Sequence, residues 1–145
     1  MTSPKSLSDM RVRDLMTGEV TTLKRNDKLS IADDIMQLGR VRHLPVVDDA
    51  DETKVVGLIT QRDLFRGSLA CSLGIGPAEQ RKLLGKVEVK EVMTSTVVTT
   101  TPGAPLREAA QLMNTRKLGC LPVVEGGKLV GILTEGDFVA LAARG

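Results

Sequence analysis

The chain has 145 residues and a formal net charge of +2, and its only aromatic residues are two phenylalanines. This length suits one compact domain or two very small ones, and the near-neutral charge without Tyr or Trp argues against binding nucleic acid mainly through phosphate contacts and base stacking. No apolar stretch approaches the ~20 residues of a membrane span, and the N-terminus lacks an apolar signal core, so we expect no membrane association.

The chain contains an internal duplication. Residues 12–47 align without a gap on residues 89–124, with 12 of 36 positions identical. After a turn that is three residues shorter in the second copy, residues 54–63 align on residues 128–137. The duplication predicts a flexible tail at 1–9, a first repeat at 10–71, a linker at 72–86 with a short helix at 78–84, and a second repeat at 87–145.

The first part of each repeat predicts a strand and a helix. In the first repeat, β-branched residues at 20–23 indicate a short strand, and the helix that follows has Asp27 as N-cap and ends near Gly39. In the second repeat, Pro105 occupies the first helical position. The apolar stripes that define the two helices are Leu29, Ala32, Ile35 and Met36 in the first repeat, and Leu106, Ala109, Leu112 and Met113 in the second.

The second part of each repeat predicts a hairpin and a further helix. Because proline cannot donate to a strand ladder, we expect Pro45 and Pro122 at a strand start or a sheet edge. Gly126 and Gly127 permit the positive φ angles of a tight hairpin. The fold class is therefore α/β (α+β): two repeats, each with helices on one face of a small mixed sheet, that pack about a pseudo-two-fold axis and leave clefts between them.

Each repeat ends its last strand with Gly-x-x-Thr-x-x-Asp. The threonine is expected to begin a helix, whose first N–H groups favour anions. Thr60 with Asp63, and Thr134 with Asp137, also match a capping arrangement that needs no ligand. The alternative is that the hydroxyl faces a phosphate while the aspartate accepts from a sugar diol. The motif alone leaves both interpretations open.

The repeated pattern Val-x-x-[Leu/Val]-Met-Thr, Val-x-Thr, Leu-Pro-Val-Val-[Asp/Glu] and Lys-[Val/Leu]-Val-Gly-x-x-Thr-x-x-Asp resembles a tandem pair of CBS domains, the regulatory modules named after cystathionine β-synthase. The resemblance covers residues 10–143. It implies β-α-β-β-α repeats packed through their sheets, adenosine-containing ligands in two clefts, and association into homodimers.

The resemblance also implies residue roles. Asp63 and Asp137 would hold ribose hydroxyls, and Thr60 and Thr134 would lie near phosphates. Thr22 and Thr99, at the end of the first strand of each repeat, would contact the base or its pocket. The strand residues implied beside the adenine are Leu44, Pro45, Leu121 and Pro122.

The repeats differ in charge near these positions. Arg42 and His43 resemble phosphate-contacting residues of nucleotide-sensing family members, whereas Gly119 and Cys120 stand there in the second repeat. The first repeat has four further cations: Lys24, Arg25, Arg40 and Arg62. Of these, only Arg40 has a charged counterpart in the second repeat, Lys117. The first cleft is therefore expected to take ATP, ADP or AMP, and the second to be empty or to take S-adenosylmethionine. Alternatively, each cation is a solvated surface residue.

Catalytic and metal-dependent functions are not expected. His43 is the only histidine, so the chain cannot assemble a His-rich metal site or a Ser-His-Asp triad. Cys71 and Cys120 are too few for a disulfide framework and are expected to be buried free thiols in a reducing cytoplasm. No residue pattern supplies an activated nucleophile or a paired acid and base, and no cofactor is required; Mg²⁺ is a candidate only as a companion of ATP.

The resemblance to CBS-domain pairs implies a stand-alone regulatory, energy-sensing module. It would bind an adenine nucleotide and signal to an unidentified effector protein through the geometry of a homodimer. The main alternative is a ligand-independent dimerisation or interaction scaffold, in which the Thr and Asp residues only cap helices. Nucleic-acid binding through the basic side of the first repeat is a third and less favoured reading.

Overall fold

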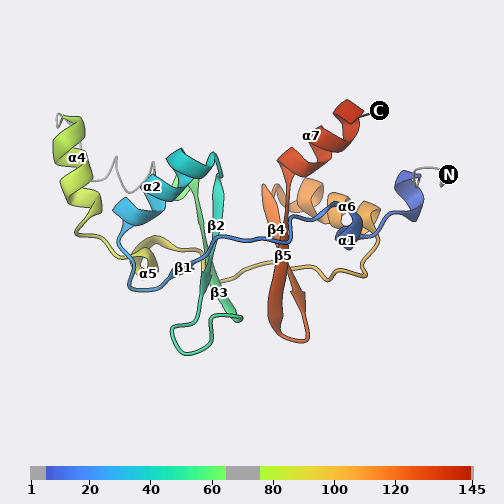
Figure 1. Ribbon diagram of the computed structural model, residues 1–145, viewed down its shortest axis with the longest axis horizontal. Helices are drawn as coiled ribbons and strands as arrows, with labels where there is room; N and C mark the ends of the chain where they lie inside the picture. Colours follow the sequence, from blue (N-terminus) through green and yellow to red (C-terminus); the bar gives the residue numbers. More distant parts are fainter. Residues whose placement is uncertain (1–5, 65–75, 145) are drawn as a thin grey trace. The chain divides into compact units, whose positions relative to one another are not determined.

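A computed structural model describes residues 6–64 and 76–144 (Figure 1). The chain divides into two compact units: unit 1 comprises Met1–Val20 and Val98–Gly145, and unit 2 comprises Thr21–Val97. Each unit therefore joins the opening segment of one sequence repeat to the strands and helices of the other. Within the described ranges, no helix combines the length and apolar character needed to cross a membrane.

Unit 2 is built on a three-stranded mixed sheet. The middle strand β2 (His43–Val47) pairs in parallel with β1 (Leu23–Lys24) and antiparallel with β3 (Val55–Thr60). Helix α2 (Leu29–Gly39) connects β1 to β2. Three residues of its predicted stripe, Leu29, Ala32 and Met36, are buried in the core of this unit, and Ile35 is partly buried against it. The predicted helix and its apolar face are therefore confirmed.

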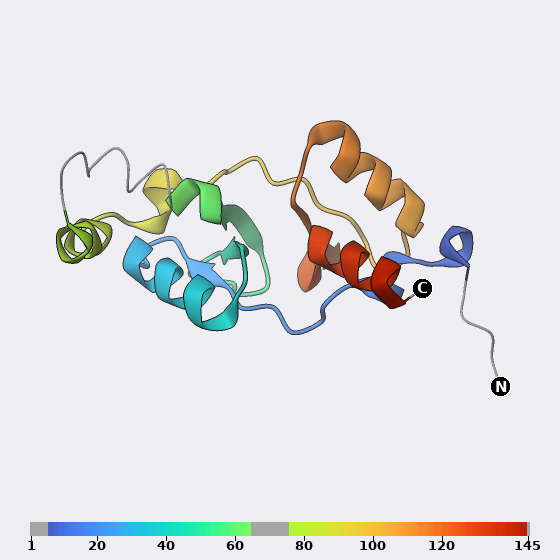
Figure 2. The same ribbon diagram turned by 90° about the horizontal axis from the view of Figure 1, so that it is seen from above.

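The rest of unit 2 continues from residue 76. Helix α4 (Pro77–Leu84) ends before Gly85, as predicted, but it begins one residue before the predicted helix at 78–84, with Pro77 in its first turn. It lies beside α2, seen from above in Figure 2, and Arg81 forms an ion pair with Asp34 across the contact, with Nη2 and Oδ1 2.6 Å apart. The four-residue helix α5 (Val89–Val92) packs on β3 and buries Val89.

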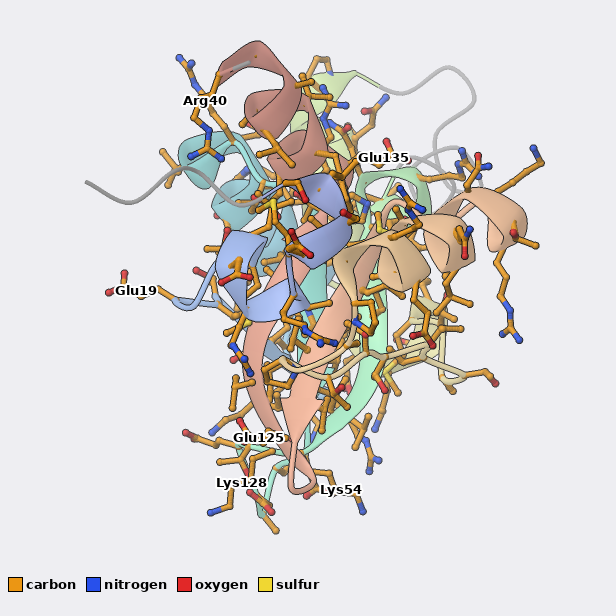
Figure 3. All side chains as sticks on the ribbon, turned by 90° about the vertical axis from the view of Figure 1, so that its right-hand side faces the viewer. Glu19, Arg40, Lys54, Glu125, Lys128 and Glu135 are labelled. Atoms are coloured by element: carbon orange, nitrogen blue, oxygen red, sulfur yellow. The ribbon has the colours of Figure 1, made fainter. Side chains whose placement is uncertain are left out.

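Unit 1 contains the antiparallel hairpin of β4 (Cys120–Glu125) and β5 (Lys128–Thr134). Gly126 and Gly127 form its turn with φ angles of 59° and 79°, which confirms the predicted hairpin. Glu125 and Lys128 flank that turn at the tip (Figure 3). Helices α6 (Leu106–Arg116) and α7 (Glu135–Arg144) pack on the hairpin.

The opening segment of the first repeat belongs to unit 1. Helix α1 (Val12–Leu15) contacts α6 and α7, and the following Thr17 forms a backbone bridge with Ile132 of β5. Unit 2 repeats this arrangement, because Thr94, which follows α5, bridges Leu58 of β3. The duplicated sequence is thus folded so that the Met-Thr pair of each repeat, Met16-Thr17 or Met93-Thr94, contacts the last strand of the other repeat.

The glycine of Gly-x-x-Thr-x-x-Asp makes this close approach feasible. A Cβ atom on Gly131 would lie 2.9 Å from the carbonyl oxygen of Thr17 and 2.7 Å from the sulfur of Met16. A Cβ atom on Gly57 would overlap the sulfur of Met93 and lie 3.2 Å from the carbonyl oxygen of Thr94. Glycine inside a strand commonly marks such an approach of another backbone.

Four local predictions require correction. Asp27 is not the N-cap of α2; Lys28 is, because the Asp27 carboxylate accepts from the Lys24 N–H (2.8 Å) in the preceding turn. Pro105 is the N-cap of α6 and not its first helical residue. The first strand comprises Leu23–Lys24 and not residues 20–23, because its pairing with β2 begins only at Leu23. Part of the expected tail, Leu7–Asp9, forms the 3₁₀-helix η1, which contacts α6.

The two prolines lie at the third position of equivalent strands. Pro122 lies in β4, one of the two strands of its sheet, but Thr100 pairs with the next residue, Val123, on the other side of β4, so the expected edge position is not confirmed. Pro45 is the third residue of β2, the middle strand, so the expectation of an edge or strand start is wrong there. The position is tolerated because β1 pairs only with Val46 and Val47, one residue beyond the proline.

Candidate functional site

The Thr60–Asp63 pair lies where β3 passes into a helical segment at residues 61–64. Oδ2 of Asp63 accepts from the Thr60 N–H at 2.8 Å and from the Thr60 hydroxyl at 3.0 Å. The Asp63 N–H donates back to the Thr60 hydroxyl at 3.3 Å. The predicted capping arrangement is therefore confirmed, and it uses one of the two carboxylate oxygens of Asp63.

The start of this helix is less open to an anion than the sequence indicates. The Gln61 N–H donates to the carbonyl oxygen of Arg42 at 2.9 Å, and the Asp63 N–H is used by the cap. In unit 1 the Glu135 N–H likewise donates to the carbonyl of Gly119 at 3.1 Å. Because N–H groups that already donate within the protein are not available to a phosphate, helix termini alone do not make an anion site here.

The Thr134–Asp137 pair repeats the cap in unit 1. Oδ2 of Asp137 accepts from the Thr134 N–H at 2.8 Å and from the Thr134 hydroxyl at 3.3 Å. A third donor comes from the opening segment, because the Thr17 hydroxyl lies 3.5 Å from Oδ1 of Asp137. Both aspartates are half-buried, and the hydrogen bonds from Thr60 and Thr134 hold their carboxylates in place.

The strands position further predicted residues beside these pairs. His43 pairs with Thr60 across β2 and β3, and Cys120 pairs with Thr134 across β4 and β5. Leu44 is 1% exposed and Leu121 is fully buried, so their side chains belong to the cores. Pro45 and Pro122 are buried as well. The four strand residues can therefore border a ligand mainly through their backbone.

The predicted threonines of the first strand are placed differently from expectation. Thr22 is half-buried and precedes β1, whereas the sequence interpretation placed it at the strand's end. Thr99 is exposed and precedes Thr100, which pairs with Val123 in an isolated parallel bridge. The shift has one cause, because only the residues that reach β2 or the β4 backbone acquire strand pairing.

The cations of the first repeat are mostly exposed. Lys24 is already engaged, since its ammonium lies 2.8 Å from Glu52, and this hydrogen bond raises the pKa of Lys24 and lowers that of Glu52. Arg40, Arg42 and Arg62 are exposed to solvent. Half-buried Arg25 holds a buried Nε with no hydrogen-bond partner among the described residues. The positive charges of Arg40, Arg42 and Arg62 are therefore surface charges.

The thiol of Cys120 is buried and free, as predicted. Burial, with a smaller contribution from the nearby Glu135 carboxylate, raises its pKa to about 12. A thiol with this pKa is protonated near neutral pH and is a poor nucleophile or metal ligand. Cys71 lies outside the described residues. In residues 6–64 and 76–144, no three His, Cys, Asp or Glu side chains are gathered as metal ligands would be.

Sequence reasoning missed Thr17 and Thr94 as neighbours of β5 and β3, the strands that precede the two aspartates. The signal was present in Gly57 and Gly131, because an isolated glycine inside an apolar strand indicates close approach of another chain segment. The Met-Thr pair also occurs in both repeats. The sequence does not indicate which of the two pairs contacts β3 and which contacts β5.

Comparison with known proteins connects this geometry to a family. The family model described as CBS domain matches residues 12–70 and 89–144. An uncharacterized protein from Methanocaldococcus jannaschii, MJ1225, is 34% identical over 134 residues, which is 90% of this chain and 42% of that protein. The chain thus spans less than half of this relative's length.

Solved structures match over nearly the whole chain. The CBS domain pair of MJ0100, in complex with 5′-methylthioadenosine and S-adenosyl-L-methionine, has a TM-score of 0.76 and 27% identity, covering 93% of this chain and 97% of that one. The structure of CBSX2 in complex with AMP has a TM-score of 0.74 and 30% identity, covering 92% of this chain and 96% of that one. Since both repeats match the family model and the fold matches CBS-domain pairs, the chain belongs to the CBS-domain family.

Proposed function

We propose that this chain is a regulatory module that binds adenosine-containing nucleotides of the ATP, ADP and AMP class. The observation that carries the proposal is the Asp63 carboxylate, which is fixed by its cap through Oδ2 while Oδ1 has no partner among the described residues. A preorganised carboxylate oxygen is what a ribose diol requires as acceptor. The AMP complex of CBSX2 and the S-adenosyl-L-methionine complex of MJ0100 support an adenosine ligand.

In this proposal each residue has a defined task. Asp63 and Asp137 accept from ribose hydroxyls, while Thr60 and Thr134 lie on the phosphate side. Arg42 and Arg62, which are exposed in unit 2, supply positive charge for phosphates, so the first repeat prefers charged nucleotides and the second accepts S-adenosylmethionine. Thr22, Thr99 and the backbone around His43 and Cys120 border the base. Mg²⁺ enters only as a companion of ATP.

Signalling follows from differential affinity. A ligand shifts an equilibrium between two arrangements of a protein only by the difference in its affinity for them. We propose that a homodimer has two such arrangements, that nucleotide occupancy selects one, and that an effector protein in the cytoplasm responds to it as a signal of energy state. The module itself performs no catalysis in this scheme.

The test is calorimetric titration with AMP, ADP, ATP and S-adenosylmethionine on the wild type and three variants. Asp63→Ala should abolish or strongly weaken the tighter binding event, and Asp137→Ala should reduce total uptake less. Asp27→Ala is the matched control, because its carboxylate also accepts a backbone N–H (2.8 Å) in unit 2 but has no role in the proposed site. Equal losses in both site variants would contradict the preference of the first repeat, and no binding of any ligand would reject the proposal.

A second candidate function is a ligand-independent interaction scaffold. Two observations favour it: the Thr-Asp pairs are explained fully as helix caps, and the apolar side chains Leu38 on α2 and Val139 on α7 are 87% and 67% exposed. Unit 1 also has a cavity of about 270 Å³ beside Leu7, Ala110 and Phe138. A scaffold would remain dimeric by analytical ultracentrifugation without any nucleotide and would lose dimerisation on Leu38→Asp or Val139→Asp.

A further inference from the structure

Asp63 and Asp137 differ in the hydrogen bonds that their carboxylates accept from the rest of the protein. Oδ1 of Asp137 receives the hydroxyl of Thr17 at 3.5 Å, while its Oδ2 accepts two donors from Thr134. Both oxygens of this carboxylate are therefore engaged within the protein. The contact is long for an O–H···O hydrogen bond and correspondingly weak.

Thr17 is held in place independently of this contact. Its N–H donates to the carbonyl oxygen of Ile132 and its own carbonyl accepts from the Ile132 N–H, both at 2.9 Å. The absence of a side chain at Gly131 lets the Met16–Thr17 backbone lie directly on β5. The backbone hydrogen bonds therefore position the Thr17 hydroxyl beside Asp137. The hydroxyl can rotate away about χ1 while the two backbone hydrogen bonds to Ile132 stay intact.

Unit 2 has the same backbone arrangement without the side-chain contact. Thr94 exchanges two backbone hydrogen bonds of 3.0 Å with Leu58, as Thr17 does with Ile132. Within residues 6–64 and 76–144, however, only Thr60 donates hydrogen bonds to the Asp63 carboxylate, and both of these bonds use Oδ2. Across the described residues, Oδ1 of Asp63 thus remains available, whereas Oδ1 of Asp137 is occupied.

We propose that the Thr17 hydroxyl is an internal competitor that makes Asp137 a latent site. This inference rests on the proposed function, because it concerns the same carboxylates as ribose acceptors. A ribose hydroxyl reaching Oδ1 of Asp63 displaces no donor among the described residues, whereas one reaching Oδ1 of Asp137 displaces the donor from Thr17. The order of filling is therefore set by a residue of the first sequence repeat acting on the acid of the second.

The experiment compares Thr17→Val with Thr94→Val, two isosteric changes at equivalent positions. Calorimetric titrations with AMP, and separately with S-adenosylmethionine, measure both binding events. Removing a competing hydrogen bond of this strength should tighten the weaker event about two- to five-fold in Thr17→Val. Thr94→Val should leave both events unchanged. Unchanged or weaker binding in Thr17→Val, with wild-type binding intact, would overturn the latency while the proposed function stands.

A second measurement requires no ligand. In a double-mutant cycle, Thr17→Val combined with Asp137→Ala should show coupling of at least about two-fold in the unfolding equilibrium constant. The cycle of Thr94→Val with Asp63→Ala should show a coupling ratio near one. Equal coupling in the two cycles would refute the asymmetry. If no variant and no wild-type protein binds either ligand, the proposed function fails and the latent site fails with it.

Discussion

The close approach of Met16 and Thr17 to Gly131 in unit 1 provides a stringent test of the pairing between the opening segment of the first repeat and β5. Gly131→Ala would place a methyl group 2.9 Å from the carbonyl oxygen of Thr17 and 2.7 Å from the sulfur of Met16. The Met16 side chain is flexible and can move aside. The Thr17 carbonyl cannot move without breaking the two 2.9 Å hydrogen bonds that join Thr17 to Ile132.

The magnitude follows from these contacts. Overpacking in a filled interior costs about 1–3 kcal/mol, and each backbone hydrogen bond that is lost contributes about 0.5–1.5 kcal/mol. We therefore expect Gly131→Ala to lower the free energy of unfolding by about 2–4 kcal/mol. Gly57→Ala should cost less, about 1–2 kcal/mol, because the Thr94 carbonyl lies farther away at 3.2 Å and the other close atom belongs to the flexible Met93 side chain.

Urea denaturation followed by far-UV circular dichroism measures this ordering. Gly18→Ala serves as the control, because Gly18 is exposed and a Cβ atom there meets nothing within 4 Å. That change should be neutral or slightly stabilising through the unfolded state. Wild-type stability in Gly131→Ala would show that the Met16–Thr17 segment does not lie on β5, and a larger loss in Gly57→Ala would refute the distance argument.

Three further predictions concern single side chains. Lys117 ends α6 with a φ of 55°, so Lys117→Gly should stabilise the protein by about 0.5–1 kcal/mol in the same assay, and destabilisation would contradict the left-handed cap. The pKa of Cys120 is raised to about 12, so in the Cys71→Ser protein this thiol should resist alkylation near pH 8, and rapid alkylation of the folded protein would disprove its burial. The protonated thiol contributes fully to stability below the unfolded pKa of about 8.5, and this contribution is lost as pH rises towards 12. The Asp34 carboxylate raises the pKa of Arg81, which is exposed. Arg81→Ala should therefore lower the melting temperature slightly at low ionic strength and leave it unchanged in about 1 M salt. An equal loss at both salt concentrations would show that the ion pair with Asp34 does not stabilise the contact electrostatically.

Local spacing predicted much of the site. A threonine three residues before an aspartate, at the end of an apolar strand, specifies a cap through contacts within one helical turn, and both Thr60–Asp63 and Thr134–Asp137 form it. The glycines of the second hairpin were predictable for the same reason, because their φ angles are fixed by the turn itself.

Features decided by a distant partner were not predictable. Met16-Thr17 and Met93-Thr94 have the same sequence, so local sequence favours neither Leu58 nor Ile132 as the partner of Thr17. Only the folded structure shows that Thr17 pairs with Ile132. The first strand of unit 2 is displaced from the β-branched run because β2 determines which residues pair. Asp27 could have capped α2 by its sequence position, but its carboxylate accepts a hydrogen bond from the Lys24 N–H in the preceding turn.

The pairing of Thr17 with Ile132 also bears on synthesis of the chain. Unit 2 is continuous in sequence and has all its residues once Val97 has left the ribosome. Unit 1 waits much longer, because Val12 and Leu15 find core partners such as Leu133 only after the chain as far as that residue has been synthesised. Contacts of such long sequence separation form slowly, and apolar side chains that await them are exposed to aggregation. The early folding of unit 2 therefore holds the middle of the chain compact while the N-terminal segment remains available for its late partner.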